Sequence, residues 1–316
     1  MRMRWEQPQR LVVVSSIIMD IMMYVDGWPP RGGDVIARAG RITPGGAFNV
    51  IETAVRLGLP VTYGGLLGVG VFGQWIRQTL REKGVAIAHE DVDPQDQDTG
   101  FDVALVETGG ERTFVTALGA ESEWSLEHLE HINLEPGDAI YLSGYEFLST
   151  TKAPDLAKWA QHVATSHLVL WDPGPLVMQI APEIRQDLLN RSNICSANRR
   201  EAELLTGASD AFDSVRRLKR RMSEGSWAIV RDGPQGAYLC GADDKVVHIP
   251  TRQTKAIDTT GAGDVHQAAL IAALAQGQSL PDAIWQANVA ASLSVEREGP
   301  GQGPDYVQLR RTLKEF

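Results

Sequence analysis

The sequence of 316 residues has few cysteines, no long apolar run, and fewer basic than acidic residues. Its two cysteines, Cys195 and Cys240, belong to no CxxC or Cys/His cluster, so we expect neither a disulfide framework nor a zinc site. The apolar stretch at residues 11–23 is interrupted by serines and by Asp20, so it falls short of the ~18 to 20 apolar residues that span a bilayer. The N-terminal residues lack the apolar core of a secretory signal, and we therefore expect a cytoplasmic protein.

Basic residues are in the minority, since 30 Lys and Arg stand against 40 Asp and Glu and give a formal net charge of -10. This charge repels a phosphate backbone and argues against general nucleic-acid binding. The basic cluster at 216–221 is interleaved with apolar residues at helical spacing, a pattern more typical of a solvated helix face than of a binding stripe. We expect no nucleic-acid partner and no membrane partner.

Short apolar runs recur along the chain and predict strands buried on both faces of a parallel sheet. Amphipathic segments between them predict helices. The strand-like runs are 11–14, 139–142, 167–171 and 227–230, and the helix-like segments include 153–164 and 212–222. Strands that alternate with helices indicate an α/β fold with a layered, mostly parallel sheet.

A Thr-Gly-Gly-Glu turn at residues 108–111 lies between two strand-like runs and predicts a β-hairpin. Together with a strand-like segment at 35–42, the hairpin would form a small sheet. The pattern leaves two interpretations open, a lid over a site and an edge extension of the main sheet. Because there is no repeat and no flexible linker, we predict one domain over residues 1–316, with a β lid formed by about 35–43 and 99–118.

The glycine-rich segment 68–73 matches GxGxxG between a strand-like and a helix-like run, with Glu90 and Asp91 ~20 residues further on. This arrangement imitates a dinucleotide-binding fingerprint. Such a fingerprint usually lies on the first βα unit, whereas a strand and a helix already precede this one, so a plain tight turn is the alternative. The sequence contains no GxxxxGK(S/T), which excludes a P-loop.

Residues 258–264, Asp-Thr-Thr-Gly-Ala-Gly-Asp, follow a strand-like run and open a helix of small residues that we predict over 265–276. Small residues at a helix N-terminus leave backbone N–H groups free to bind phosphoryl oxygens. Asp264 has two interpretations. It is either an acid that stabilises the helix dipole, worth ~0.3 to 1 kcal/mol, or a base that accepts the proton of a substrate hydroxyl during attack on phosphorus.

Several segments together resemble the ribokinase-like, or PfkB-type, carbohydrate kinases. The sequence DTTGAGD is similar to the C-terminal signature of that family, and TPGGAFN is similar to its N-terminal signature. A glycine turn, an NxxE element and a strand-turn before the nucleotide loop also follow in the order of the family, which removes the dinucleotide interpretation. The segments are 43–49, 68–73, 198–201, 230–236 and 258–264.

The resemblance implies a ribokinase-like three-layer α/β/α sandwich with a mostly parallel central sheet and a small β-sheet lid. It implies an ATP-dependent kinase that transfers the γ-phosphate to a hydroxymethyl group of a furanose-like sugar. The implied cofactors are ATP and Mg²⁺, with K⁺ as a further expectation, and the lid would pair two copies into a homodimer. A nucleoside kinase on the same fold is one alternative, and a non-catalytic sugar or nucleotide sensor is another.

Residue by residue, the resemblance implies that Asp264 is the catalytic base and that the Gly261, Ala262 and Gly263 amides form the anion hole for the transferred phosphoryl group. The implied residues of the sugar site are Asp20, Gly45, Gly46, Asn49 and Glu146.

On the nucleotide side the resemblance implies Asn198, Glu201 and Asn288, with Glu201 holding Mg²⁺ through water and Asp258 at a monovalent cation site. For Asn198 the alternative is a helix cap. For Asn288 it is an exposed position on a helix. His266 either packs within its helix or contacts the substrate.

Overall fold

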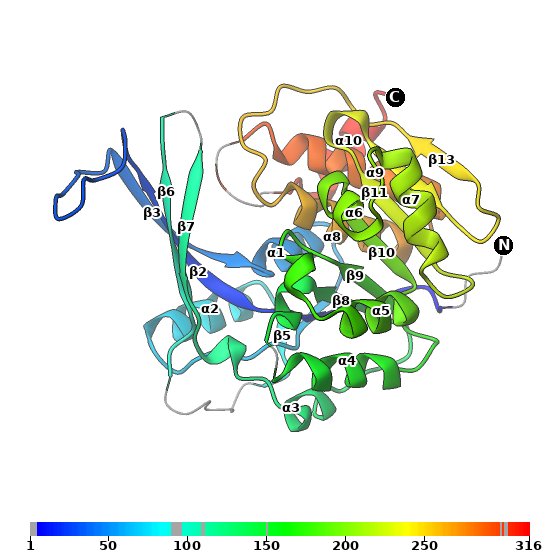
Figure 1. The fold of residues 1–316 in the computed structure, drawn as a ribbon, viewed down its shortest axis with the longest axis horizontal. Coiled ribbons are helices and arrows are strands. Elements are labelled where there is room, and N and C mark those ends of the chain that lie inside the picture. Colours follow the sequence, from blue (N-terminus) through cyan, green and yellow to red (C-terminus); the bar gives the residue numbers. More distant parts are fainter. Residues whose placement is uncertain (1–4, 90–96, 109–110, 150, 298, 300–302) are drawn as a thin grey trace.

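The structure is a computed structural model that describes residues 5–89, 97–108, 111–149, 151–297, 299 and 303–316. Two expected features lie outside the described residues, namely the acids Glu90 and Asp91 and the Gly-Gly tip of the hairpin. A nine-stranded sheet forms the centre, in the order β13-β12-β11-β10-β9-β8-β1-β4-β5 (Figure 1). Neighbours from β11 to β5 pair in parallel, and β12 and β13 add antiparallel strands at one edge.

Four of these strands, β1, β8, β9 and β11, follow the predicted apolar runs. The bounds of all the strands in this sheet are β1 (Arg10–Val14), β4 (Val61–Tyr63), β5 (Ala86–Ile87), β8 (Asp138–Ser143), β9 (Leu168–Asp172), β10 (Ile194–Asn198), β11 (Trp227–Arg231), β12 (Ala237–Cys240) and β13 (Val246–Ile249).

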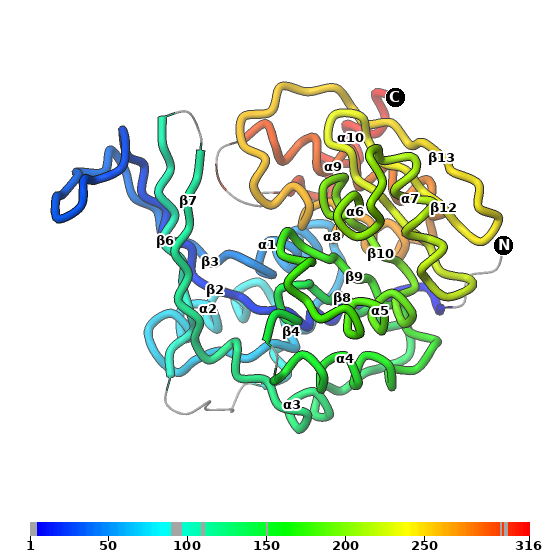
Figure 2. Tube along the Cα trace, in the orientation of Figure 1, coloured from blue at the N-terminus to red at the C-terminus, as the bar shows by residue number. Residues whose placement is uncertain are grey.

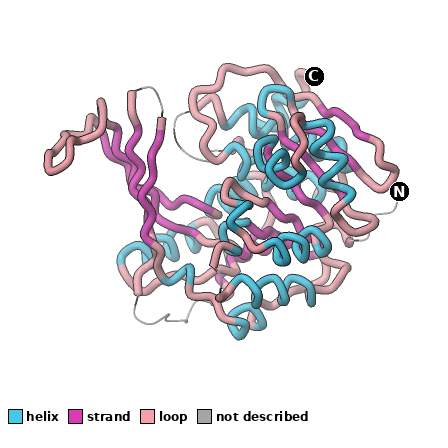
Figure 3. The backbone as a smooth tube through the Cα atoms, viewed as in Figure 1, coloured by secondary structure: helices cyan, strands magenta, loops and turns pink. Residues whose placement is uncertain are grey.

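Helices cover both faces of the sheet, as Figure 3 shows. Alternate residues of β1 point to opposite sides, with Leu11 and Val13 in one apolar core and Val12 and Val14 in the other. The first core includes residues of α1 (Phe48–Arg56), α2 (Val71–Glu82), α8 (Ala262–Ala275), α9 (Leu280–Ser294) and α10 (Tyr306–Leu313). The second includes residues of α3 (Leu126–Glu130), α4 (Ala153–His162), α5 (Pro182–Arg191), α6 (Arg199–Thr206) and α7 (Ala211–Arg220).

The predicted three-layer α/β/α sandwich is therefore confirmed. None of the described helices combines the length and the hydropathy that crossing a membrane would require.

A second, four-stranded sheet stands beside the main body, at the left of Figures 1 and 2. Its order is β3-β2-β6-β7, with bounds β2 (Ile17–Tyr24), β3 (Ala39–Gly46), β6 (Phe101–Val106) and β7 (Arg112–Ala117). The predicted hairpin is confirmed, and the edge-extension interpretation is wrong because this sheet is separate.

Two details of the small sheet differ from the sequence prediction. The strand expected at 35–42 runs instead over Ala39–Gly46, and residues 17–24, which belonged to no predicted element, form a long strand of their own. The reason is the polar break at Ser15 and Ser16, where the chain leaves the main sheet and enters the small one. This crossing places Asp20 on the small sheet.

Candidate active site

The N-terminal and C-terminal motifs meet in the structure. Helix α1 packs against α8, and Nδ2 of Asn49 donates a 3.0 Å hydrogen bond to Oδ2 of Asp264. Burial raises the pKa of Asp264 to about 7, the hydrogen bond from Asn49 and the charge of Arg231 act against this rise, and the negative charge of Asp172 adds to it. A carboxyl group with this pKa can exchange a proton near neutral pH.

The predicted anion hole is the first turn of α8. The helix begins at Ala262 rather than at residue 265, because Gly261 takes a left-handed conformation with φ of 71° and caps it. The Ala262 amide donates to the Thr259 carbonyl at 3.2 Å. The Gly261 and Gly263 amides have no hydrogen-bond partner among the residues that the structure describes. Two of the three predicted donors are therefore open to a ligand, and Asp264 follows them directly.

Asp20 and Gly45 lie in direct contact on neighbouring strands of the small sheet. A Cβ at position 45 would lie 2.1 Å from both carboxylate oxygens of Asp20, so only glycine leaves room for that carboxylate. Burial, and then the charges of Asp102 and Asp264, raise the pKa of Asp20 to about 7. The backbone requires glycine at position 46, because this residue adopts a φ of 60° and an added Cβ would lie 2.8 Å from the Ser16 carbonyl oxygen.

Asp102, which no sequence motif indicated, completes this group. It pairs with Asp20 across the parallel β2–β6 ladder, so both side chains lie on the same face of the small sheet. Its side chain is buried, its Oδ1 atom has no hydrogen-bond partner among the described residues, and burial raises its pKa to about 6. A buried carboxylate oxygen without a partner is costly and indicates a ligand.

Glu146 is placed differently from the other residues predicted for the sugar. It lies in the short 3₁₀ turn η2 (Gly144–Phe147), and its oxygens accept hydrogen bonds from the Ser16 amide at 2.7 Å, the Ser16 hydroxyl at 2.9 Å and Nε1 of Trp124 at 3.0 Å. Burial raises its pKa to about 7 against these bonds. The carboxylate thus stabilises the junction between β1 and β2. Because both of its oxygens already accept hydrogen bonds within the protein, this arrangement does not fit a direct sugar contact.

Asn198 and Glu201 form a reciprocal cap at the start of α6. Oδ1 of Asn198 accepts from the Glu201 amide at 2.9 Å, and the Glu201 carboxylate accepts from the Asn198 amide at 2.8 Å and from its Nδ2 at 2.6 Å. The alternative of a helix cap is therefore present in the structure. Burial and the charge of Asp172 raise the pKa of Glu201 to about 7.

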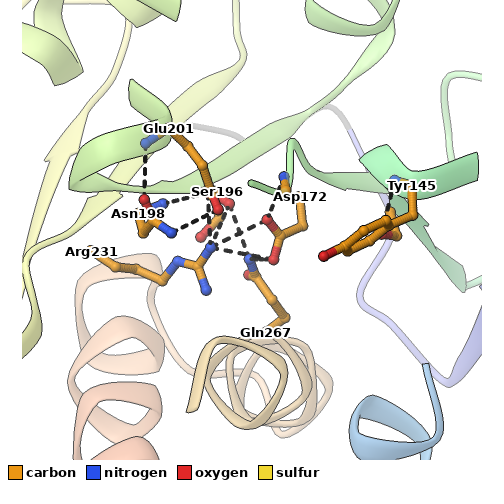
Figure 4. Close-up of polar contacts among 9 residues, drawn as sticks. Tyr145, Asp172, Ser196, Asn198, Glu201, Arg231 and Gln267 are labelled. Atoms are coloured by element: carbon orange, nitrogen blue, oxygen red, sulfur yellow. Dashed lines mark hydrogen bonds and ion pairs between the residues drawn. The ribbon is translucent and has the colours of Figure 1, made fainter. Parts of the chain in front are cut away.

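A buried polar cluster surrounds Glu201 at the carboxyl ends of β9, β10 and β11 (Figure 4). Nη2 of Arg231 lies 3.2 Å from Oδ2 of Asp172 and 3.7 Å from Oε2 of Glu201. Nε2 of Gln267 on α8 donates to Oδ2 of Asp172 and to the Ser196 carbonyl, both at 3.0 Å. The local sequence contains only a weak signal for this cluster, because its members come from four separate segments.

Asn288 is buried, so the alternative of an exposed helical position is wrong. Its Nδ2 donates to the Ile249 carbonyl at 3.0 Å and to the Pro250 carbonyl at 2.8 Å, and its Oδ1 lies 3.2 Å from Nε2 of His266. His266 is also buried, and burial, reinforced by the charge of Arg231, lowers its pKa to about 3. The pair ties α8 and α9 to the end of β13.

The Asp258 carboxylate already has three partners. Oδ1 accepts from Nη2 of Arg112 at 2.6 Å and from the Thr260 amide at 2.8 Å, and Oδ2 accepts from the Gly299 amide at 3.1 Å. Although burial acts in the other direction, the bonds to Thr260 and Gly299 and the charge of Arg112 lower the pKa of Asp258. A carboxylate with a guanidinium and two amides on its oxygens does not fit a potassium ligand.

The GxGxxG segment is a tight turn. The amides of Phe72 and Gly73 at the start of α2 donate to the Asp98 carboxylate at 3.0 and 2.8 Å, so the helix N-terminus already carries an anion. A Cβ on Gly73 would lie 1.9 Å from the Gly68 carbonyl oxygen. These glycines therefore serve close packing.

Comparison with known proteins agrees with this architecture. The chain matches the pfkB family of carbohydrate kinases over residues 8–305. It is 30% identical over 304 residues to an uncharacterized sugar kinase, YegV, of Escherichia coli (strain K12), covering 95% of this chain and 93% of that protein. It is 26% identical over 294 residues to the ribokinase of Bacillus subtilis (strain 168), covering 91% of this chain and 93% of that one.

Solved structures share the fold. Arabidopsis thaliana ribokinase complexed with ribose and ATP has a TM-score of 0.79 at 24% identity, covering 97% of this chain and 99% of that chain. The family match extends over all the strands described above, both sheets included, and over the helices up to α9. The chain therefore belongs to the PfkB family of carbohydrate kinases, and it is a sugar kinase, a transferase with an alcohol group as acceptor.

Proposed function

We propose that this sugar kinase transfers the γ-phosphate of ATP to a hydroxymethyl group of a furanose-like sugar, with Asp264 as the general base. The observation that carries the proposal is the first turn of α8. There Asp264, held by Asn49, directly follows the Gly261 and Gly263 amides, which have no partner in the described part of the chain. A base beside an anion site is what transfer to a hydroxyl requires. A non-catalytic sensor would need no base at this position.

In the proposed reaction Asp264 accepts the hydroxyl proton while the hydroxyl oxygen forms a bond to the γ-phosphorus. The bond from that phosphorus to the β–γ bridging oxygen breaks, and its electron pair leaves with ADP. The Gly261 and Gly263 amides donate hydrogen bonds to the transferred oxygens. Because the transition state is largely dissociative, positioning and charge neutralisation dominate, and the base contributes ~10²- to 10⁴-fold.

Magnesium fits this site as an ion that arrives with ATP. No group of three or more His, Cys, Asp or Glu side chains among the described residues could hold a metal alone. Glu201 still brings a carboxylate to the ends of the strands, whereas the Asp172 carboxylate there is already bonded by Arg231 and Gln267. Oγ of Ser196 and Oε1 of Gln267 are buried there without a described partner. Mg²⁺ keeps several waters and binds through few carboxylates plus phosphates. When bound, it would neutralise phosphate charge, with Glu201 orienting its waters.

A screen of acceptors tests the proposal. ADP release is measured by a coupled assay with pentoses, hexoses, their phosphates and nucleosides. We expect a neutral sugar to stimulate ADP release, and we expect hydrolysis of ATP without a sugar to be slow, because a closed small sheet excludes water as an acceptor. Stimulation by nucleosides alone would instead support the nucleoside kinase, and no stimulation by any acceptor would contradict the proposal.

We also propose that two copies pair through the outer face of the small sheet, opposite the face that carries Asp20. One row of β-branched residues crosses all four strands on this outer face, namely Ile42, Ile21, Val103 and Val115. Ile42 is 47% exposed and Val115 is 68% exposed. Because an exposed apolar row on a sheet is unfavourable in water, a second copy of the same surface is the partner that suits it.

The double variant Ile42→Glu/Val115→Lys is expected to be a monomer where the wild type is a dimer, as measured by analytical ultracentrifugation. Val307→Lys on α10, which is 75% exposed and distant from the small sheet, is the matched control and should stay dimeric. A monomeric wild type would overturn this part of the proposal.

Potassium is expected to have no effect on turnover, because the Asp258 carboxylate already forms an ion pair with Arg112, which is permanently charged. The measurement is kcat in buffers whose only monovalent cation is K⁺, Na⁺ or tetramethylammonium. We expect values that agree within about twofold, since the electrostatic role at Asp258 is already filled. Strong activation by K⁺ alone would show that this ion pair opens and that the carboxylate faces a cation after all.

A further inference from the structure

Arg231 lies at the end of β11 with its guanidinium held between acids, as Figure 4 shows. Its side chain is only 11% exposed. The Nη2 atom makes the contacts, at 3.3 and 3.2 Å to the two carboxylate oxygens of Asp172 and at 3.3 Å to the Ser196 carbonyl. Gln267 donates to the same carboxylate and the same carbonyl, so the position of this guanidinium is fixed by several groups.

The other side of the guanidinium faces the first turn of α8. A Cβ added to Gly263 would lie 2.4 Å from Nη1 of Arg231, so this nitrogen occupies the space beside the proposed anion hole. Neither Nη1 nor the buried Nε has a hydrogen-bond partner among the residues that the structure describes. A buried donor of a charged group such as Nε is rarely left unpaired, and the unpaired Nη1 beside it leaves a charged donor for an anionic ligand.

The charges of the surrounding groups also favour an anionic ligand beside Arg231. Arg231 is the one cation among the residues labelled in Figure 4, where Asp172 and Glu201 are the acids. Asp264 is also within electrostatic range, since the Arg231 charge lowers its pKa against the effect of burial. A guanidinium remains protonated at any physiological pH, so it can stabilise a phosphoryl group and cannot compete with Asp264 for the substrate proton.

We infer that Arg231 is a catalytic residue that donates from Nη1 to an oxygen of the migrating phosphoryl group, beside the Gly263 amide. In this role Asp172 and Gln267 are positioning residues that hold the guanidinium. The inference rests on the proposed function and adds a charged donor to it. During transfer the acceptor oxygen bonds to the γ-phosphorus, the bridging bond breaks toward ADP and the hydroxyl proton goes to Asp264, while Arg231 keeps all its protons. A preorganised cation at this place stabilises the charge that develops in the transition state.

The test uses the double variant Arg231→Met/Asp172→Asn, which removes the cation together with its nearest paired charge, while the Glu201 carboxylate keeps its hydrogen bonds from Asn198. Arg231→Lys keeps the charge without the planar fork. Arg220→Met is the matched control, because Arg220 is exposed and pairs with Asp244 at the far end of α7. Two properties are measured for each protein, namely kcat with the best sugar of the screen and the dissociation constants for Mg·ADP with and without aluminium fluoride, which mimics the transferred group.

For the double variant we expect kcat to fall by about 10²- to 10³-fold, the loss typical of one transition-state donor. The affinity for Mg·ADP should change by less than about threefold, whereas the gain in affinity that aluminium fluoride gives the wild type should disappear. Arg231→Lys should recover part of both quantities, and Arg220→Met should match the wild type. A purely structural role would weaken Mg·ADP and the aluminium fluoride complex equally.

The inference is overturned if the wild type gains no affinity from aluminium fluoride, or if the double variant gains as much as the wild type. Failure of the proposed function looks different, because it would be seen as sugar-independent ADP release or as full turnover in Asp264→Asn. Asp264→Asn could lose turnover as expected while the double variant keeps the affinity gain from aluminium fluoride. That result would show that Arg231 takes no part in the mechanism, and the kinase assignment would stand.

Discussion

Replacing Asp264 by Asn is expected to lower kcat by ~10²- to 10⁴-fold, which is the range of general-base assistance in phosphoryl transfer. Asn has nearly the same shape as Asp, and its Oδ1 can still accept the hydrogen bond from Asn49. The affinity for Mg·ATP, measured by titration calorimetry, should therefore stay within a few-fold of the wild type. The sugar KM should also change little, so that the loss is confined to the chemical step.

The control for this experiment is Asp282→Asn. Asp282 is likewise an acid in the first turn of a helix, α9, but it is exposed. If Asp264 acted only on the helix dipole, both variants would lose a few tenths of a kcal/mol of stability and keep full turnover. A wild-type kcat in Asp264→Asn would refute the assignment of the base.

The pH dependence of wild-type kcat/KM provides an independent test of Asp264 as the general base. Because only the unprotonated carboxylate can accept a proton, and because burial places its pKa at about 7, kcat/KM should fall as the pH is lowered below about 7. It should approach a tenfold loss per pH unit on that side and a plateau on the alkaline side. The residual activity of Asp264→Asn should lack this acid limb, and an unchanged limb would assign it to another group such as Asp20.

The Gly45→Ala variant is expected to raise the sugar KM by about 10- to 150-fold, the equivalent of one charge-assisted hydrogen bond lost or displaced. The added Cβ would lie 2.1 Å from both carboxylate oxygens of Asp20, so the carboxylate must turn away from the site. The affinity for Mg·ATP should not change, because Gly45 and Asp20 lie on the small sheet and not on the strands that carry the nucleotide-side residues.

Gly40→Ala is the matched control on the same strand. Its added Cβ would meet only the Met22 carbonyl oxygen at 3.9 Å, an ordinary contact, and its backbone is not left-handed. Steady-state kinetics with a saturating ATP concentration should separate the two variants. Equal sugar KM values for Gly45→Ala and Gly40→Ala would show that Asp20 does not bind the sugar.

Much of the fold could be predicted from local sequence. Runs such as 139–142 and 227–230 are apolar at every position, which only strands covered on both faces tolerate, and they form β8 and β11. The residues at 17–24 escaped prediction because their pattern continues that of β1, and only the pairing with β3 and β6 shows that they belong to the small sheet. Strand partners depend on contacts distant in sequence, which a local pattern does not contain.

The same division holds for the site. Asp264 could be named from the sequence because the glycines and small residues before it reveal a special backbone conformation, and Asn49 was implied by the family resemblance. Asp102 stands in an ordinary strand, and nothing in its local sequence separates it from a surface charge. Arg231 lies in segment 230–236, which resembles the family, but the resemblance assigned it no role. Their role became visible through burial, through unpartnered donor and acceptor atoms, and through the register that places Asp102 opposite Asp20.

The sequence by itself determined the class of fold, the turn that opens α8 and the family signatures, because short-range backbone and burial requirements fix which residues are allowed there. The tertiary structure decided which charges share one site. Burial raises the pKa values of Asp20, Asp102 and Asp264, carboxylates from three distant segments, and the charges of Asp102 and Asp264 raise the pKa of Asp20 further. One arginine lies beside the open amide of Gly263. Such coupling depends on distances of a few ångströms between elements, and only the packed chain sets those distances.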